Sequence, residues 1–115
     1  VTFRFPFRCD APDMRRFMQM EIFPLAKRDV CFRSCLVREE RRDDVALLEA
    51  DVDRSDELVK ICSWCKKIEI SASEWVEAEV AMQRLNLFEA RKLPALTHGM
   101  CPTCHATYLK NLTDT

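Results

Sequence analysis

The N-terminal third of the chain alternates between apolar and polar positions. In residues 1–9, three phenylalanines share one face, and polar side chains and Pro6 share the other. A period of two is typical of a half-buried β-strand. A proline within it favours an edge strand or a bulge, because proline has no N–H for the ladder. We therefore expect a strand at the edge of a sheet.

Two further stretches continue this pattern. Residues 16–23 place Met18 and Met20 on one face. A helix is the competing interpretation, but the alternation and the following Pro24 favour a strand. Residues 30–37 predict a third strand. Short connections between successive strands are typical of an antiparallel meander, and we expect its apolar side chains to form a core.

The segment between the two halves is rich in charge. Residues 39–44 carry six charged side chains in a row, which we interpret as a solvated turn or linker. Residues 45–48 are apolar and predict a short insertion against the sheet, and residues 51–57 are acidic, as in a second linker or the start of a helix. We expect three parts, namely strands in 1–42, a linker in 43–57 and a second unit in 58–115.

The second unit begins with a predicted strand and a predicted helix. Residues 66–71 alternate and predict the strand. Ser73 precedes acidic residues and apolar positions at helical spacing, which predicts a helix over residues 74–89 with Ser73 as its N-cap. We expect Leu93 and Pro94 to end this region.

The chain closes with a predicted helix over residues 102–112. Pro102 would occupy its first turn, where the missing N–H removes no hydrogen bond. A small antiparallel meander followed by a strand and two helices makes an α+β fold.

Two Cys-x2-Cys motifs carry the clearest chemical signal. Cys62 and Cys65 form one pair, and Cys101 and Cys104 form the other. Four thiolates in two such pairs can surround one Zn2+ as a closed tetrahedron, which is typical of a structural site and leaves no open position for catalysis. We expect one structural zinc ion, with the second pair at the start of the last helix, as in a treble-clef finger.

Other interpretations of this region stay open. The same ligands suit iron or an iron–sulfur centre. Cys-Pro-Thr-Cys before a helix is typical of a redox dithiol, although the usual βαβ context is missing, and the pairs could also bind no metal. His98 and His105 flank the second pair, and either could replace a cysteine or contact one by hydrogen bonding. For His98 we expect a hydrogen bond that orders the loop over residues 97–100.

The other three cysteines predict packing. Cys31 and Cys35 share one face of the predicted strand, but at ~3.3 Å per residue they lie about 13 Å apart, which is too far for one ion. We expect both, with Cys9, to be buried small apolar residues. Seven cysteines cannot all pair within one chain, and metal-type pairs favour a reducing cytosol.

Charge and composition argue against several classes of protein. The net charge is −1, from 18 basic and 19 acidic residues, whereas a nucleic-acid binder is expected to carry a basic excess. No stretch approaches the ~20 apolar residues of a membrane span, and the N-terminus lacks a signal-peptide pattern. Because the chain starts at Val1 and not at Met, we expect a fragment or a processed product.

Two stretches resemble known families. The sequence Ile61-Cys-Ser-Trp-Cys-Lys-Lys-Ile68, followed by Thr97-His-Gly-Met-Cys-Pro-Thr-Cys104, is similar to a cysteine module of bacterial signalling proteins, where it follows PAS-type sensory or response-regulator domains. The first half, from Phe5-Pro-Phe-Arg-Cys-Asp-Ala-Pro-Asp onward, resembles the last three strands of a PAS-like sensory domain. These resemblances imply a role in bacterial signal transduction and carry over no catalytic residues.

The predicted function is a non-enzymatic, zinc-stabilised regulatory or interaction module, which acts in the cytoplasm with a protein partner and is compatible with a homo-oligomer. No Ser/His/Asp set or pair of catalytic carboxylates is visible. One alternative is a thiol-based redox or metal sensor, in which the metal ligands release zinc on oxidation and Cys31 or Cys35 contributes. A zinc-ribbon nucleic-acid binder is the second, although the balanced charge speaks against it.

Overall fold

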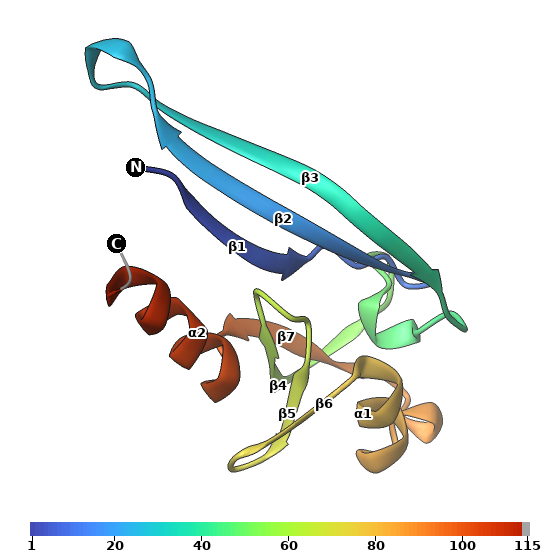
Figure 1. Ribbon diagram of the computed structural model, residues 1–115. Coiled ribbons are helices and arrows are strands. Elements are labelled where there is room, and N and C mark those ends of the chain that lie inside the picture. Colours follow the sequence, from blue (N-terminus) through green and yellow to red (C-terminus); the bar gives the residue numbers. More distant parts are fainter. Residues whose placement is uncertain (114–115) are drawn as a thin grey trace.

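The computed structural model describes residues 1–113, which fold into two β-sheets and two α-helices (Figure 1). The first sheet has the order β1-β2-β3, and the second has the order β6-β5-β4-β7. The predicted α+β class is therefore confirmed. The elements in chain order are β1 (Phe3–Arg8), β2 (Met14–Pro24), η1 (Ala26–Arg28), β3 (Val30–Arg41), η2 (Ala46–Leu48), β4 (Arg54–Cys62), β5 (Ile68–Ser71), β6 (Glu74–Val76), α1 (Ala78–Arg84), η3 (Leu87–Glu89), β7 (Leu93–Gly99) and α2 (Pro102–Thr113).

The first sheet confirms the predicted antiparallel meander. Its strands pair in sequence order, with Phe5 opposite Met20 and Met20 opposite Ser34. β1 is an edge strand, as the proline at position 6 predicted. The apolar side chains of β1 and β2 consequently lie on one face, as expected from their period of two.

This apolar face does not form the core that we expected. It is half-buried on β1 and exposed on β3, where Phe32 is 66 % exposed. The prediction of three buried cysteines is also wrong, because Cys9 and Cys35 are exposed and Cys31 is half-buried. The β2–β3 hairpin extends beyond the second sheet (Figure 1), and the radius of gyration of 16.3 Å exceeds the roughly 13 Å of a compact chain of this length. The second half therefore does not cover much of this sheet.

The buried core lies around the second sheet. Leu47 of η2 and Ile68 of β5 are fully buried, and they pack in one cluster with Ile61 of β4 and with Ala81 and Met82 of α1. The predicted apolar insertion thus supplies core residues. The expected linker over 43–57 contains η2 and the start of β4, while the division of the chain into separate domains stays a prediction.

The charged run over residues 39–44 is not the solvated turn that we expected. Its first residues extend β3, where Glu39 and Glu40 pair across the sheet with Arg16 and Arg15. The N···O distances of these two ion pairs are 3.6 and 3.5 Å. Opposite charges on neighbouring strands stabilise the pairing, so a charged sequence can prolong a strand.

The acidic segment over residues 51–57 is also part of a sheet. β4 begins within it at Arg54, whose guanidinium donates hydrogen bonds to the carbonyl oxygens of Pro94 at 2.8 Å and Leu47 at 2.7 Å. One side chain thus connects the starts of β4 and β7 with η2.

The predicted helix over residues 74–89 is wrong in its first part. Those residues begin with the short strand β6, in which Val76 pairs with Ile68. Ser73 is not an N-cap, because it lies at φ 75° in the turn between β5 and β6. Aromatic and β-branched residues at 75 and 76 favour a strand when a partner strand is available. The helix is confined to α1, and Asn86 has the left-handed backbone conformation just beyond it.

Leu93 and Pro94 begin a strand and do not end the region. β7 runs parallel to β4, with Ile61 opposite His98 and Cys62 opposite Gly99. The predicted loop over residues 97–100 is therefore mostly strand. By contrast, the predicted last helix is confirmed as α2.

Ion pairs join the first sheet to the second half. The guanidinium of Arg8, at the end of β1, donates to Asp10 at 2.5 and 3.1 Å and to Glu77, just before α1, at 2.7 and 2.9 Å. The nearly buried Arg42 also pairs with Asp10, at 3.2 Å. Burial alone would raise the pKa of Glu77, but the hydrogen bonds and charge of Arg8 outweigh it, and the pKa lies below its usual value.

The substitution Leu47→Ala should lower the free energy of unfolding by about 2–5 kcal/mol, because it leaves a cavity in a closed core. Leu58→Ala is the matched control, since Leu58 is 68 % exposed, and it should change stability by less than about 0.5 kcal/mol. Urea unfolding of both variants tests this. Equal effects would contradict the position of the core.

The stability of the protein should depend on the ionisation of Glu77. A carboxyl group with a lowered folded-state pKa contributes stability above its unfolded pKa of about 4.3, and this contribution is lost as the pH falls through the folded pKa. Glu77→Gln should therefore lower stability at pH 7 and make it fall less steeply between about pH 5 and 3. Unfolding curves across this range measure the effect, with the exposed Glu57→Gln as control. A slope like that of the wild type would count against the Arg8–Glu77 pair.

Candidate metal centre

The first cysteine pair lies in the turn between β4 and β5. Cys62 ends β4, and its N–H donates to the carbonyl of Lys67 at 2.8 Å. The N–H of Lys66 donates back to the carbonyl of Cys62 at 3.0 Å, and Lys66 adopts a positive φ of 65°. These bonds close a tight turn that brings Cys62 and Cys65 together.

The second pair begins α2, as the sequence predicted. Cys101 directly precedes the helix, and its sulfur accepts the N–H of Cys104 at 3.4 Å. The N–H of His105 donates to the carbonyl of Cys101 at 2.9 Å. Cys101 therefore caps the first turn, and the positive end of the helix dipole favours negative charge on the sulfurs there.

The two pairs meet in one cluster of four sulfurs. The Sγ atoms of Cys62, Cys65, Cys101 and Cys104 all lie within 4.8 Å of one another, and those of Cys65 and Cys101 are 3.6 Å apart. Zn–S bonds of about 2.3 Å in a tetrahedron would place the sulfurs about 3.8 Å apart. All seven cysteines are free thiols. These four cysteines can therefore hold one metal ion.

The environment of the cluster does not suit four free thiolates. Burial opposes ionisation of Cys62, but backbone N–H groups outweigh it and lower the pKa of this thiol to about 7. Burial raises the pKa of Cys65 to about 11 and also raises the pKa of Cys104, and the neighbouring thiols add to both shifts. A bound cation would remove this conflict, because a metal ion deprotonates its thiol ligands.

The structure does not bring the histidines into the cluster. His98 is exposed on β7, and His105 is exposed on α2. Among residues 1–113, the side chains of this cluster that could bind a metal ion are those of the four cysteines. The other three cysteines, Cys9, Cys31 and Cys35, lie in or beside the first sheet and outside the cluster. The sequence also predicted that they do not belong to the four-cysteine group.

Trp64, inside the first Cys-x2-Cys turn, joins the centre to its surroundings. Its ring stacks on Phe5 of β1 with a centroid distance of 4.6 Å, and it meets Tyr108 of α2 edge to face at 5.8 Å. Its carbonyl accepts the N–H of Arg8 at 2.6 Å. Sequence reasoning missed this role, although a large aromatic side chain in a tight turn signals an apolar partner elsewhere in the chain.

Two of the cavities formed by the described residues border the cluster. One, of about 260 Å³, has a partly polar wall that includes Lys67, Ser73 and Thr103. The other, of about 190 Å³, has a mostly apolar wall that includes Phe7 and Trp64. Cys65 and Cys104 line both cavities.

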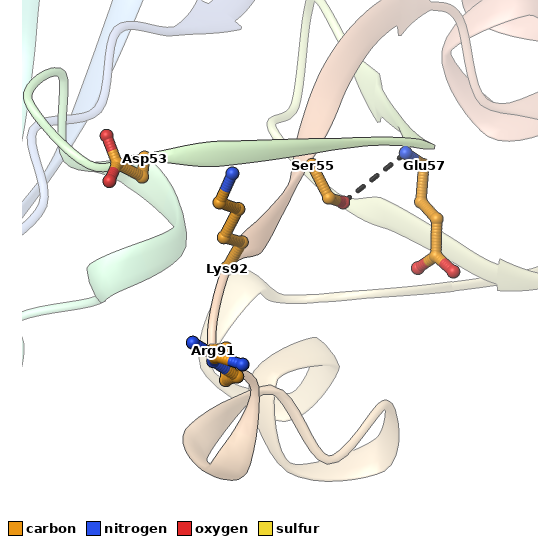
Figure 2. A pocket seen from close by; sticks show the side chains of 5 residues that line it. All are labelled: Asp53, Ser55, Glu57, Arg91 and Lys92. Carbon is orange, nitrogen blue, oxygen red and sulfur yellow. Dashed lines mark hydrogen bonds between the residues drawn. The ribbon is translucent and has the colours of Figure 1, made fainter.

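A larger cavity lies elsewhere. It is an open groove of about 710 Å³ near the starts of β4 and β7, and Figure 2 shows its lining residues. Asp53 and Glu57 bring negative charge to it, and Arg91 and Lys92 bring positive charge. The one hydrogen bond drawn among these residues runs from the N–H of Glu57 to the hydroxyl of Ser55, at 3.3 Å. The balanced charge indicates no particular ligand.

Within residues 1–113, no helix is both long and apolar enough to cross a membrane.

Comparisons of the chain with models of protein families, with curated proteins and with solved structures find no match.

Proposed function

We propose that Cys62, Cys65, Cys101 and Cys104 hold one structural Zn2+ ion. The observation that carries this proposal is the approach of their four sulfurs to within 4.8 Å of one another. A tetrahedral set of four thiolates suits zinc or iron. We favour zinc, because it takes this closed coordination in structural sites without redox chemistry.

The ion would act by holding the fold together. It would connect the turn between β4 and β5 to the first turn of α2, two elements that a long crossover separates in the sequence. Structural zinc contributes roughly 10–16 kcal/mol of binding free energy in finger peptides. That amount exceeds the net stability of most small domains, so the second half would depend on its metal.

We further propose that the chain is a non-enzymatic regulatory module in bacterial signal transduction that contacts a protein partner. The resemblance of the two cysteine motifs to a module of bacterial signalling proteins supports this role. A contact with protein is also supported by the exposed apolar side chains of Val30, Phe32 and Leu36, which occupy alternate positions on one face of β3, because exposed apolar patches often mark interaction sites.

Protein purified without added metal should contain about one zinc ion per chain by elemental analysis. Cys62→Ser should lose this ion, and the loss should unfold the second half, as circular dichroism would report. The matched control is Cys35→Ser, which should keep the metal because Cys35 is exposed on the first sheet. A fully folded protein that contains no metal would refute the proposal, and bound iron would change the identity of the ion.

The regulatory role has a separate test in the genome. We expect the gene to lie beside genes for sensory kinases or response regulators, since the resemblance is to proteins of that class. A consistent neighbourhood of unrelated metabolic genes would speak against a role in signalling and would leave the metal site untouched.

A further inference from the structure

Burial divides the four sulfurs of the cluster into two pairs. Cys62 and Cys101 are buried, at 0 % and 4 % exposure, whereas Cys65 and Cys104 are half-buried. Each Cys-x2-Cys motif therefore contributes its first cysteine to the buried pair and its second cysteine to the half-buried pair. The half-buried cysteines also belong to different elements, because Cys65 lies in the turn between β4 and β5 and Cys104 lies in the first turn of α2.

The cavities beside the cluster show where the half-buried pair is open. Cys65 and Cys104 line both the partly polar cavity of about 260 Å³ and the mostly apolar cavity of about 190 Å³. Of these two cavities, Cys101 lines only the first, and Cys62 lines neither. A water molecule takes about 30 Å³ of liquid volume, and hydrogen peroxide has only one oxygen atom more. Either cavity therefore has room for peroxide beside the two sulfurs.

The other two sulfurs are held inside the fold. Cys62 ends β4, and its N–H donates to the carbonyl of Lys67 at 2.8 Å. The sulfur of Cys101 accepts the N–H of Cys104 at 3.4 Å. Distance does not select a pair among the four sulfurs, because all lie within 4.8 Å of one another and those of Cys65 and Cys101 are 3.6 Å apart. Access therefore decides which thiols a reagent meets.

We propose that Cys65 and Cys104 form a modification site for hydrogen peroxide, which joins them in a disulfide and releases the metal. This inference rests on the proposed zinc site. In the first step the thiolate of either cysteine attacks one peroxide oxygen, the O–O bond breaks, and a sulfenic acid and hydroxide form. In the second step the other thiolate attacks that sulfur and displaces a second hydroxide. Two thiolates thus lose two electrons, peroxide is reduced, and Zn2+ leaves after losing two ligands.

The position of this disulfide gives it a structural consequence. A bond between Cys65 and Cys104 joins the β4–β5 turn to α2, which are the two elements that the metal would connect. A disulfide within one motif, such as Cys62–Cys65, would leave these elements unconnected. The oxidised chain should therefore stay folded after the metal has left, with Tyr108 of α2 still packed against Trp64. Peroxide would exchange a metal link for a covalent one.

The first experiment maps the disulfide. It uses the zinc-loaded variant Cys9→Ser/Cys31→Ser/Cys35→Ser, because those three cysteines are exposed or half-buried and would consume reagent. Peroxide should release about one zinc ion per chain to a chelating dye, and peptide mass spectrometry should find the Cys65–Cys104 disulfide. A limiting amount of iodoacetamide, which reports access without peroxide, should label the same two cysteines and leave the buried pair unmodified.

A matched pair of variants separates the half-buried sulfurs from the buried ones. Histidine can replace one cysteine as a zinc ligand and forms no disulfide. Cys104→His removes a half-buried sulfur, so most of the zinc should stay bound at a peroxide dose that empties the parent protein. Cys62→His removes a buried sulfur instead, and it should still form the Cys65–Cys104 disulfide. Where a variant fails to bind zinc, the disulfide map of the first experiment decides the question.

A further measurement tests the covalent link. The reduced chain should lose the fold of its second half when a chelator removes the metal, as the proposed function predicts. The oxidised chain should keep its circular dichroism spectrum in the same chelator. Dithiothreitol should then unfold it, because reduction breaks the only link that remains between the two cysteine motifs after the metal has left.

The failures of the two proposals are distinguishable. A chain that contains no zinc after purification would refute the proposed function, and its disulfide map would still decide which sulfurs react. A zinc-loaded chain that resists peroxide, or that forms a disulfide other than Cys65–Cys104, would overturn this inference and leave the zinc site in place. An oxidised chain that unfolds when the metal leaves would overturn the covalent link.

Discussion

The candidate metal centre depends on the parallel pairing of β4 with β7. Parallel strands bring their carboxyl ends to the same edge of a sheet, and at that edge Cys62 lies opposite Gly99. The N–H of Ser63 donates to the carbonyl of Gly99 at 2.9 Å, which continues the contact into the turn. Cys101 follows two residues later. The two cysteine pairs therefore lie close together because β4 and β7 are neighbouring strands. The long stretch of sequence between the pairs is the crossover connection that parallel strands require.

Both ends of this pair of strands are held by side chains. At one end, Arg54 donates to the carbonyl of Pro94 and also to η2, so that the starts of the strands and the core insertion are connected. At the other end, the four sulfurs gather. The crossover between the strands contains the β5–β6 hairpin and α1, and it contributes Ile68, Ala81 and Met82 to the buried cluster. The four cysteines and the buried core thus lie on the same arrangement of strands.

The first sheet is attached to this unit mainly at one end. Arg8 pairs with Glu77, and Phe5 stacks on Trp64, while the β2–β3 hairpin extends away from the second sheet (Figure 1). Trp64 lies between Cys62 and Cys65, so the side chain that stacks on the first sheet belongs to the turn that carries two of the four sulfurs.

Local signals in the sequence predicted a large part of this structure. Alternation identified all three strands of the first sheet, Pro6 identified its edge, and Pro102 identified the start of the last helix. The four cysteines were identified by spacing alone, since two residues between thiols let both face one ion. Each of these signals is complete within a few neighbouring residues, which is why no knowledge of the rest of the chain was needed.

The features that the sequence did not predict depend on partners far away in the chain. Val76 is in a strand because Ile68 lies beside it, and the charges of Glu39 and Glu40 extend β3 because arginines lie opposite on β2. Likewise, an alternating pattern marks an apolar face but cannot say whether anything covers it. The sequence by itself therefore determined the four cysteines of the candidate metal centre and most local elements. Only the tertiary structure decided the parallel pairing that unites the ligands, and the exposure of the first sheet, because both follow from long-range contacts that leave no local pattern.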